Sequence, residues 1–185
     1  MTARVRAGRR ADLAAVYRVC ATTDATGLGT PPRPFDDKLP GHVYAGPYLA
    51  ADPGLTFVVE DDAGVGGYVS ATADTVRFNQ WLDAHWWPRL RRRYPPGMFA
   101  PAGPHRPWFD THPAHLHIKV ARRLQGQSCG RRLMDTVLAA LQGRGVAGVH
   151  LGVAEANTRA VAFYTALGFT EAHRHAWGST LVRNL

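Results

Sequence analysis

The sequence is poor in cysteine and in long apolar stretches, and both shortages restrict the class of protein. Only two cysteines, Cys20 and Cys129, occur in 185 residues, which is too few for a disulfide framework and indicates a reducing compartment. No apolar run approaches membrane-spanning length, and residues 1–10 lack the apolar core of a signal peptide. We therefore expect a cytoplasmic protein that forms a single domain over residues 1–185 and does not enter a membrane.

The sequence also lacks a nucleic-acid-binding signature, although its net charge is +8. We find no recognition-helix, zinc-finger or RNA-binding pattern, so we do not expect nucleic acid as a partner. The basic run at residues 89–93 keeps a nucleic-acid-binding protein as a third alternative, behind two hypotheses that follow from the motifs below.

The most informative stretch runs from residue 116 to residue 141 and predicts a strand, a turn and a helix. Three apolar residues alternate with His117 and Lys119, as in a half-buried strand: Leu116, Ile118 and Val120. The polar turn spans Gln125–Gly130 and contains neither the dinucleotide fingerprint nor the P-loop fingerprint. From Arg131 onward, apolar residues recur at helical spacing: Leu133, Met134, Val137, Leu138 and Leu141.

Strand, turn and helix in this order predict an anion site. Backbone N–H groups at a helix N-terminus have no intrahelical partner, and the helix dipole favours negative charge there. Four arginines flank the predicted helix start: Arg122, Arg123, Arg131 and Arg132. Cations in a first helical turn are unfavourable by roughly 0.3–1 kcal/mol each unless an anion is present. Solvated surface arginines are the alternative interpretation.

Two motifs in the chain resemble those of the GNAT family of acetyl-coenzyme A-dependent N-acetyltransferases. The family's phosphate loop reads Gln/Arg-x-x-Gly-x-Gly/Ala and follows a strand Val by five residues; Val120, Gln125 and Gly130 match it here. Ser128 stands where the family has its middle glycine. Downstream, residues 157–169 resemble the family's N-x-x-A-x-x-x-Y-x-x-x-G-F helix at all five fixed positions.

The resemblance implies an α/β fold with a mixed central sheet, in which two central parallel strands splay apart and hold the thioester of acetyl-CoA. Acetyl-CoA would be the cosubstrate, and no metal would be needed. The coenzyme-binding residues that the resemblance implies are Ile118, Lys119, Val120, Gln125, Gly126, Gln127, Ser128, Cys129, Gly130, Arg131, Asn157 and Tyr164. Asn157 also suits the N-cap of its helix, and Tyr164 also suits a core position.

Tyr164 stands at the family's general-acid position, and two further residues are candidates for the amine's proton. A phenol with a pKa near ~10 holds its proton at neutral pH and can donate it to a departing thiolate. Asp110 and His117 precede the phosphate loop, and a histidine can accept the proton that the amine loses. Many family members carry a Glu on the next strand, but Gly152 occupies that position here; Glu155 or water is the next candidate.

Residues 113–118 also resemble the subset of the family that is related to the acetyltransferase-like domain of O-GlcNAcase. That likeness, together with Ser128, supports a second hypothesis, a non-catalytic protein that binds acetyl-CoA. If the protein is an enzyme, the acceptor amine stays open: a small amine, an antibiotic, an amino sugar or a protein lysine.

Other segments give weaker expectations. We predict a helix capped by Asp12, a long loop over residues 23–53 with at most a helical turn, and a helix over residues 76–92 that Pro88 ends or kinks. Four tryptophans are candidates for core packing, for the acceptor pocket or for a homodimer interface: Trp81, Trp86, Trp87 and Trp108. Four histidines that could suggest a metal lack a recognised ligand spacing: His105, His112, His115 and His117.

Overall fold

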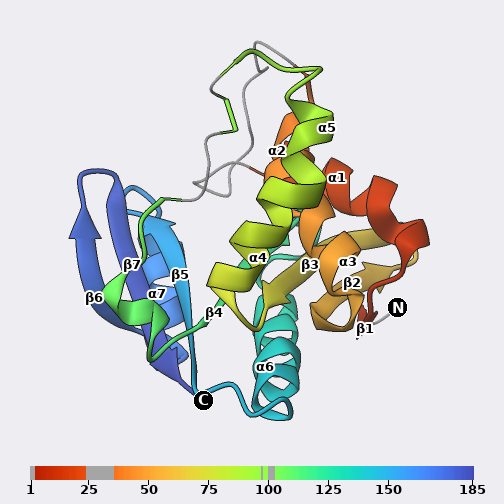
Figure 1. The fold of residues 1–185 in the computed structure, drawn as a ribbon. Coiled ribbons are helices and arrows are strands. Elements are labelled where there is room, and N and C mark those ends of the chain that lie inside the picture. Colours follow the sequence, from red (N-terminus) through yellow and green to blue (C-terminus); the bar gives the residue numbers. More distant parts are fainter. Residues whose placement is uncertain (1–2, 24–35, 97, 100–102) are drawn as a thin grey trace.

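The computed structural model describes residues 3–23, 36–96, 98–99 and 103–185. They form a seven-stranded sheet with helices on both faces (Figure 1). The strands are β1 (Arg4–Ala7), β2 (Thr56–Asp61), β3 (Gly64–Thr72), β4 (Ala114–Val120), β5 (Gly148–Ala154), β6 (Thr170–His175) and β7 (Gly178–Asn184). The helices are α1 (Leu13–Thr22), α2 (Leu39–Tyr44), α3 (Gly46–Ala51), α4 (Thr75–Trp81), α5 (Trp87–Leu90), α6 (Cys129–Gln142) and α7 (Thr158–Ala166). Within these ranges no helix has the length and apolar character that crossing a bilayer requires.

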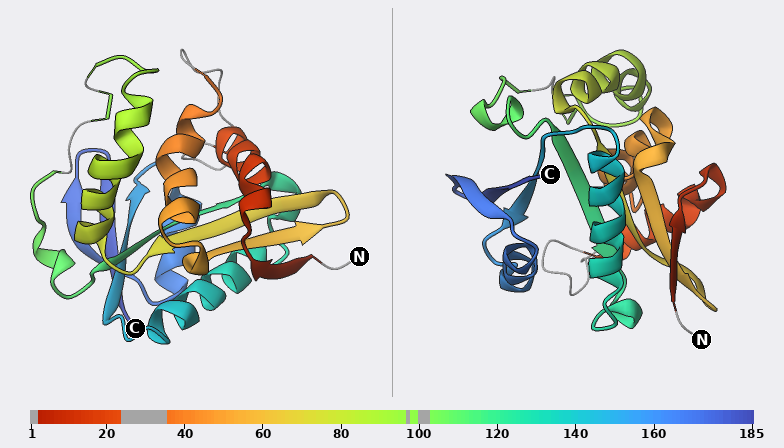
Figure 2. Two further views of the ribbon diagram at one scale, coloured as in Figure 1. Left: turned by 45° about the vertical axis from the view of Figure 1, so that its right-hand side comes forward. Right: turned by 90° about the horizontal axis from the view of Figure 1, so that it is seen from below.

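The sheet is mixed, and its two parallel strands separate. The strand order is β1-β2-β3-β4-β5-β7-β6, and neighbouring strands are antiparallel except β4 and β5. These two strands pair only at Ala114 with Val149 and at His115 with His150. Beyond the second pair they diverge, and Figure 2 shows β5 leaving with β6 and β7 while β4 stays with β3. The predicted splay of two central parallel strands is confirmed.

Alternate strand residues supply a separate core on each face of the sheet. Val59 and Val69 pack in the same cluster as the buried residues of α6, whereas Val58 and Tyr68 pack with α1. This separation follows from the two-residue period of a strand. Helix α6 is fixed by fully buried side chains such as Leu133, each contributing about 2 kcal/mol through burial. Its first turn is thereby held beside the end of β4.

A third hydrophobic cluster is formed by residues of α3, α4 and α5, and three of the tryptophans belong to it or pack against it. Trp87 is buried there with Tyr48 and Phe78, and Trp81 and Trp86 pack against the same cluster. Core packing is therefore the role that the structure gives to these three tryptophans. Trp108 lies elsewhere, stacked on His173 of β6 with ring centroids 5.5 Å apart.

The segment between α1 and β2 is more regular than its composition suggests. We expected a long loop with at most one helical turn over residues 23–53, but residues 39–51 form α2 and α3. Pro40 and Pro47 stand in the first turns of these helices, where the missing N–H costs nothing. Glycine and proline therefore mark helix starts here, and tertiary packing outweighs the low helix propensity. Residues 24–35 lie outside the described part of the chain.

Three other expectations need correction in detail. Asp12 precedes α1, but its carboxylate accepts from the Arg9 N–H at 2.8 Å and pairs with Arg6, so it does not cap that helix. The helix over residues 76–92 is interrupted by a π-helical turn, Leu82–Trp86, just before Pro88, which lacks a backbone donor. Helix α6 begins at Cys129, so the last two residues of the predicted turn Gln125–Gly130 are helical.

Candidate functional site

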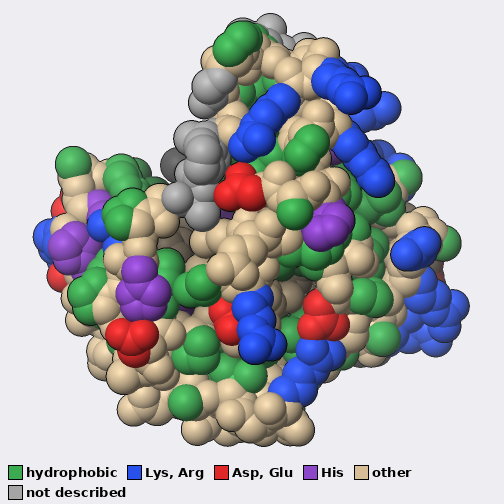
Figure 3. All heavy atoms as spheres, viewed as in Figure 1, with side chains coloured by type: hydrophobic (Ala, Val, Ile, Leu, Met, Phe, Trp, Pro, Cys, Tyr) green, Lys and Arg blue, Asp and Glu red, His purple; other side chains and the backbone are tan. Residues whose placement is uncertain are grey.

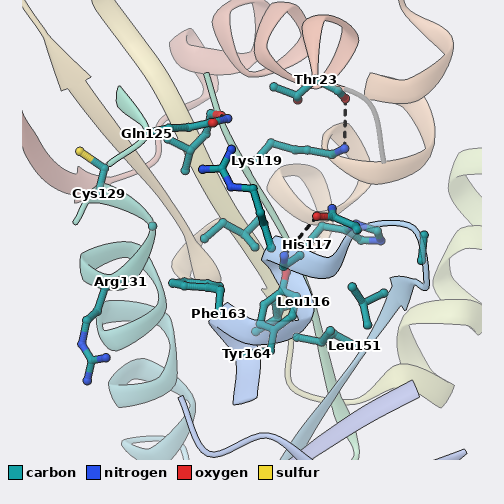
Figure 4. A pocket seen from close by; sticks show the side chains of 18 of the residues that line it. Thr23, Leu116, His117, Lys119, Gln125, Cys129, Arg131, Leu151, Phe163 and Tyr164 are labelled. Atoms are coloured by element: carbon teal, nitrogen blue, oxygen red, sulfur yellow. Dashed lines mark hydrogen bonds between the residues drawn. The ribbon is translucent and has the colours of Figure 1, made fainter. Parts of the chain in front are cut away.

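The separation of β4 and β5 opens a cavity of about 970 Å³ in the middle of the molecule. Figure 4 shows β4, the first turn of α6, β5 and α7 around it. The predicted coenzyme-binding residues that line it are Ile118, Lys119, Val120, Gln125, Gly126, Ser128, Cys129, Gly130, Arg131, Asn157 and Tyr164. His117, the predicted proton acceptor, lines the same cavity. Two motifs that are distant in sequence therefore meet in one site.

The loop after β4 is closed by a side chain of its own. The Gln125 amide donates from Nε2 to the Val120 carbonyl at 3.0 Å, so a glutamine five positions after Val120 can reach back to the end of the strand. Gly126 has φ 75° and Ser128 has φ 56°, so both adopt the left-handed conformation. Ser128 thus takes the backbone shape for which a glycine would be the natural choice.

The loop leads into α6, whose first backbone N–H groups have no intrahelical partner. Within the described residues, the first backbone bond into this helix is from the Arg132 N–H to the Ser128 carbonyl, at 3.0 Å. The N–H groups of Cys129, Gly130 and Arg131 precede it and have no intrahelical partner. Together with about half a positive charge from the helix dipole, they form a site for phosphate oxygens.

Only one of the four predicted arginines lines this cavity. Arg131 does so, with its side chain 59% exposed. Arg123 instead pairs with Asp61 at 2.9 Å, and Arg132 donates to the Ala3 carbonyl at 2.7 Å. Both guanidinium groups therefore stabilise the fold near the loop, and the expectation of a four-arginine cluster was wrong. Arg159, in the first turn of α7, is a cavity-lining cation that we did not identify from the sequence.

Two predicted site residues lie outside the cavity. Gln127 is exposed and donates from Nε2 to the Arg123 carbonyl at 2.8 Å. The Asp110 carboxylate is 73% exposed and lies 3.2 Å from Nε2 of His105, so it does not orient His117. In both cases closeness in sequence to the loop did not fix the direction of the side chain.

The edge of β4 that faces β5 offers backbone groups to a ligand. The Ala121 N–H donates to the Gly66 carbonyl on the β3 side, at 2.7 Å. Because backbone groups alternate between the two edges of a strand, those of Leu116, Ile118 and Val120 point toward β5. The ladder with β5 has already ended at His115, so these groups border the cavity. The Val120 carbonyl already accepts from Gln125, and an extended ligand can pair with the remaining groups as an added strand would.

Tyr164 lies deep in the cavity wall. Its side chain projects from α7 toward Leu116 of β4 in Figure 4, and only 9% of the residue is exposed. Burial raises the pKa of Tyr164 to about 12. The phenol therefore keeps its proton at every pH at which the protein would work. The Asn157 carboxamide caps the same helix, accepting from the Ala160 N–H at 3.1 Å.

Two histidines project from the other face of β4, away from α6. His115 is held at both ring nitrogens, 2.7 Å from the Tyr48 hydroxyl and 2.7 Å from the Thr75 hydroxyl. The ring of His117 packs against Tyr44, with centroids 4.7 Å apart. Burial and, to a smaller extent, the Lys119 ammonium lower the pKa of His117 to about 4. His117 is therefore neutral at neutral pH and less basic than we expected from the sequence.

Two further expectations concern nucleic acid and metal ions. In Figure 3, Lys and Arg side chains are interspersed with Asp and Glu over this face of the molecule. Among the described residues, no three His, Cys, Asp or Glu side chains converge as metal ligands would. Of the histidines that drew attention in the sequence, His105 contacts the Asp110 carboxylate, and the rings of His112 and His115 are bonded to hydroxyl groups. His117 packs against the Tyr44 ring.

The left-handed conformation of Ser128 gives a first prediction. Replacing Ser128 by Gly should raise the free energy of unfolding by about 0.5–1 kcal/mol, because relief of the strain exceeds the added chain entropy of glycine. Gly126→Ala is the matched control. The backbone there is left-handed, so alanine should be destabilising, and because nothing lies within 4 Å of an added Cβ the effect comes from the backbone and not from a clash. Urea unfolding of both variants measures this. A destabilised Ser128→Gly protein would contradict it.

A cavity between splayed parallel strands, with a helix N-terminus at one end, defines the acyl-CoA N-acyltransferase fold. The model of the acetyltransferase (GNAT) family matches residues 28–169. The chain belongs to this family and is an enzyme of the N-acetyltransferase class.

Similar proteins agree with this assignment. The crystal structure of SsHAT superposes with a TM-score of 0.90 at 38% sequence identity, covering 100% of this chain and 98% of that one. The Salmonella typhimurium protein yncA, solved with its cofactor acetyl-CoA, has a TM-score of 0.63 at 16% identity, covering 100% and 94%, and so shares the fold. Rat O-GlcNAcase is 24% identical over 176 residues, which are 86% of this chain and 19% of the rat protein. The chain thus spans about a fifth of that relative's length.

Proposed function

We propose that residues 1–185 act as one N-acetyltransferase domain that transfers the acetyl group of acetyl-CoA to a primary amine by direct attack. The observation that carries this proposal is the shared cavity: the α6 N-terminus, the open edge of β4 and Tyr164 all border one space. Other proteins of this fold support the choice of cosubstrate, since yncA is solved with acetyl-CoA and a PaiA acetyltransferase with coenzyme A.

The coenzyme would lie along the cavity from the loop to Tyr164. Its pyrophosphate would accept from the N–H groups at the start of α6, and Arg131 would neutralise part of its charge. The pantetheine arm would pair with the β4 edge around Ile118 and Val120. A free N–H on that edge would hold the thioester carbonyl and stabilise the oxyanion that forms when the amine attacks.

Tyr164 would assist departure of the thiolate. Its pKa of about 12 lies above the ~8.5 of a thiol, so complete proton transfer to the thiolate is uphill. Hydrogen-bond donation in the transition state is then the larger part of its contribution, and the proton follows as the carbon–sulfur bond breaks. The amine's proton would leave on the other side of the sheet, past His117.

Two measurements in sequence test the proposal. Calorimetry with acetyl-CoA should show saturable binding that weakens as salt is added. Thiol release should then be followed with a polyamine, an arylalkylamine, an amino sugar and a lysine peptide. Absence of binding at millimolar acetyl-CoA would exclude the enzyme and the non-catalytic binder together. Binding without turnover of any amine would favour the non-catalytic alternative, which the likeness to O-GlcNAcase and the presence of Ser128 in the loop support. The left-handed conformation of Ser128 shows that serine can adopt the shape the loop requires.

The arginines near the loop allow a matched comparison. Arg131→Ala should weaken acetyl-CoA binding by roughly 5–10-fold, because one partly exposed phosphate contact is worth about 1 kcal/mol. Arg123→Ala removes the same charge from a side chain that pairs with Asp61, and should leave the affinity nearly unchanged. Calorimetry at low salt measures both. Equal losses in the two variants would mean that general charge, and not a contact at the α6 N-terminus, attracts the coenzyme.

A further inference from the structure

A second, smaller cavity adjoins the first at the point where β4 and β5 separate. Its volume is about 240 Å³, and it is lined by Thr75, His115, Leu116, His117, His150, Leu151 and Gly152. Four of these residues, Leu116, His117, Leu151 and Gly152, also line the large cavity. The small cavity therefore opens into the gap that would hold the thioester. Its three imidazoles come from β4 and β5, and their hydrogen bonds differ.

His115 cannot take up a proton without losing a hydrogen bond. The Thr75 hydroxyl donates to the Pro113 carbonyl at 2.7 Å, so it must accept from Nδ1–H of His115. Nε2 of His115 is then the unprotonated nitrogen and accepts from the Tyr48 hydroxyl at 2.7 Å. Both nitrogens are used in a buried chain, and the ring is locked in its neutral form.

His150 is oriented differently, with one nitrogen left for the cavity. Its Nδ1 lies 2.7 Å from the His112 carbonyl oxygen, which can only accept, so Nδ1 carries the proton and Nε2 carries a lone pair. Phe109 stacks on the ring with centroids 5.0 Å apart, and His115 lies 5.6 Å away on β4. The carbonyl stabilises the protonated form of this ring, and no comparable acceptor is bonded to His115.

Gly152, two residues after His150, carries no acid or base, and the Trp177 ring lies beside it. Residues 150 and 152 lie on the same face of β5, because side chains alternate along a strand. Gly152 has no side chain, and a Cβ built there would lie 2.9 Å from the Trp177 ring. The position at which many family members carry a Glu is therefore vacant of any acid or base. An imidazole two residues earlier, on the same face, can supply the missing base.

We propose that His150 is the acceptor of the proton that the amine loses during acetyl transfer, with Nε2 receiving it across the small cavity. This inference rests on the proposed function. The amine nitrogen forms a bond to the acetyl carbon and the carbon–sulfur bond breaks. The nitrogen's proton passes by way of water beside His117 to Nε2 of His150, and Tyr164 supplies the proton of the departing thiol. The groups in contact with the His150 ring are His112 and Phe109, from the segment before β4, and His115 from β4. His117 of β4 and Thr75 of α4 line the same small cavity.

The first test separates a proton-accepting role from a structural one. His150→Asn places an amide N–H where Nδ1–H was, so it can keep the bond to the His112 carbonyl while Nε2 is lost. We expect kcat/KM, measured with the fastest amine of the panel, to fall by roughly 10²–10⁴-fold and its acidic limb to disappear. Acetyl-CoA affinity and thermal midpoint should stay unchanged. His85→Gln, at an exposed position on the π-helical turn after α4 and outside both cavities, is the control.

Chemical rescue and a spectrum complete the test. Added imidazole should restore turnover of His150→Ala in proportion to its free-base concentration, and should not restore His117→Gln. Nitrogen-15 NMR of histidine-labelled wild-type protein with coenzyme A should show a neutral His150 ring that is protonated at Nδ1. The signals of His150 are assigned as those that are absent from the spectrum of His150→Asn. Wild-type turnover in His150→Asn, or a proton on Nε2, would overturn the inference. If acetyl-CoA binds but no amine of the panel reacts, the result counts against the proposed function. The nitrogen-15 spectrum would still determine the tautomer of His150.

Discussion

Replacing Tyr164 by Phe should lower turnover by roughly 10²–10⁴-fold while acetyl-CoA affinity stays nearly constant. The substitution keeps the ring, which packs with Phe163 and Phe169, and removes only the hydroxyl. Without that donor the thiolate must leave unassisted into a water-poor cavity. Because burial raises the pKa of Tyr164 to about 12, the wild-type rate should show no basic limb from this residue below about pH 11. Thiol release under saturating acetyl-CoA measures the effect.

Tyr68→Phe is the matched control for this experiment. It removes a hydroxyl from another buried tyrosine, on the α1 face of the sheet and outside both cavities. Its turnover should equal that of the wild type. If Tyr164→Phe also retained wild-type turnover, Tyr164 would be a core residue of α7 and the thiolate would leave without a tyrosine donor.

Acid should destabilise the protein before its carboxylates titrate, because the cleft contains buried neutral histidines. Burial lowers the pKa of His117 to about 4, compared with about 6.5 in the unfolded chain. Between these values the unfolded state binds more protons, so the contribution of His117 to stability is complete above about pH 6.5 and is lost as the pH falls toward 4. The difference corresponds to about 3 kcal/mol. Burial lowers the pKa of His115 and His150 in the same direction.

Urea unfolding of wild type and His117→Gln from pH 7.5 to pH 4.5 measures this contribution. Glutamine does not titrate, so the slope of stability against pH should be clearly smaller in the variant. His85→Gln makes the same replacement at the surface and controls for the loss of an imidazole elsewhere. Carboxylates contribute at lower pH, since the Arg6 hydrogen bond lowers the pKa of Asp12. Identical slopes in wild type and His117→Gln would contradict the prediction.

Much of the fold could be predicted because its signals are local. Alternation in residues 116–120 and helical spacing after residue 130 depend only on near neighbours, and both elements are present as β4 and α6. The spacing of Val120 and Gln125 has a local cause as well, the hydrogen bond from the amide to the strand carbonyl. Within residues 157–169, Asn157 caps α7, the helix ends at Ala166, and Gly168 follows the C-cap with a φ of 82° that suits this position.

The errors concern side chains whose direction is set by distant segments. Arg123 pairs with Asp61 at the β2–β3 hairpin, and Arg132 reaches the N-terminal segment at Ala3. Asp110 is near β4 in sequence but faces His105. A sequence shows that charges are close along the chain; which of them face the same cavity depends on where the partners from other elements lie.

The sequence by itself determined the strand, turn and helix around the loop, because their short spacings depend only on near neighbours. Its two motifs also carried the resemblance to the family, and that resemblance implied the splayed sheet and the coenzyme loop. Only the tertiary structure decided the hydrogen bonds of His115 and His150, on which the proposed proton transfer rests. His115 and His150 are neighbours through strand pairing, and their protons are fixed by Thr75 and by the His112 carbonyl. Those contacts join separate elements, so no periodicity in the chain could reveal them.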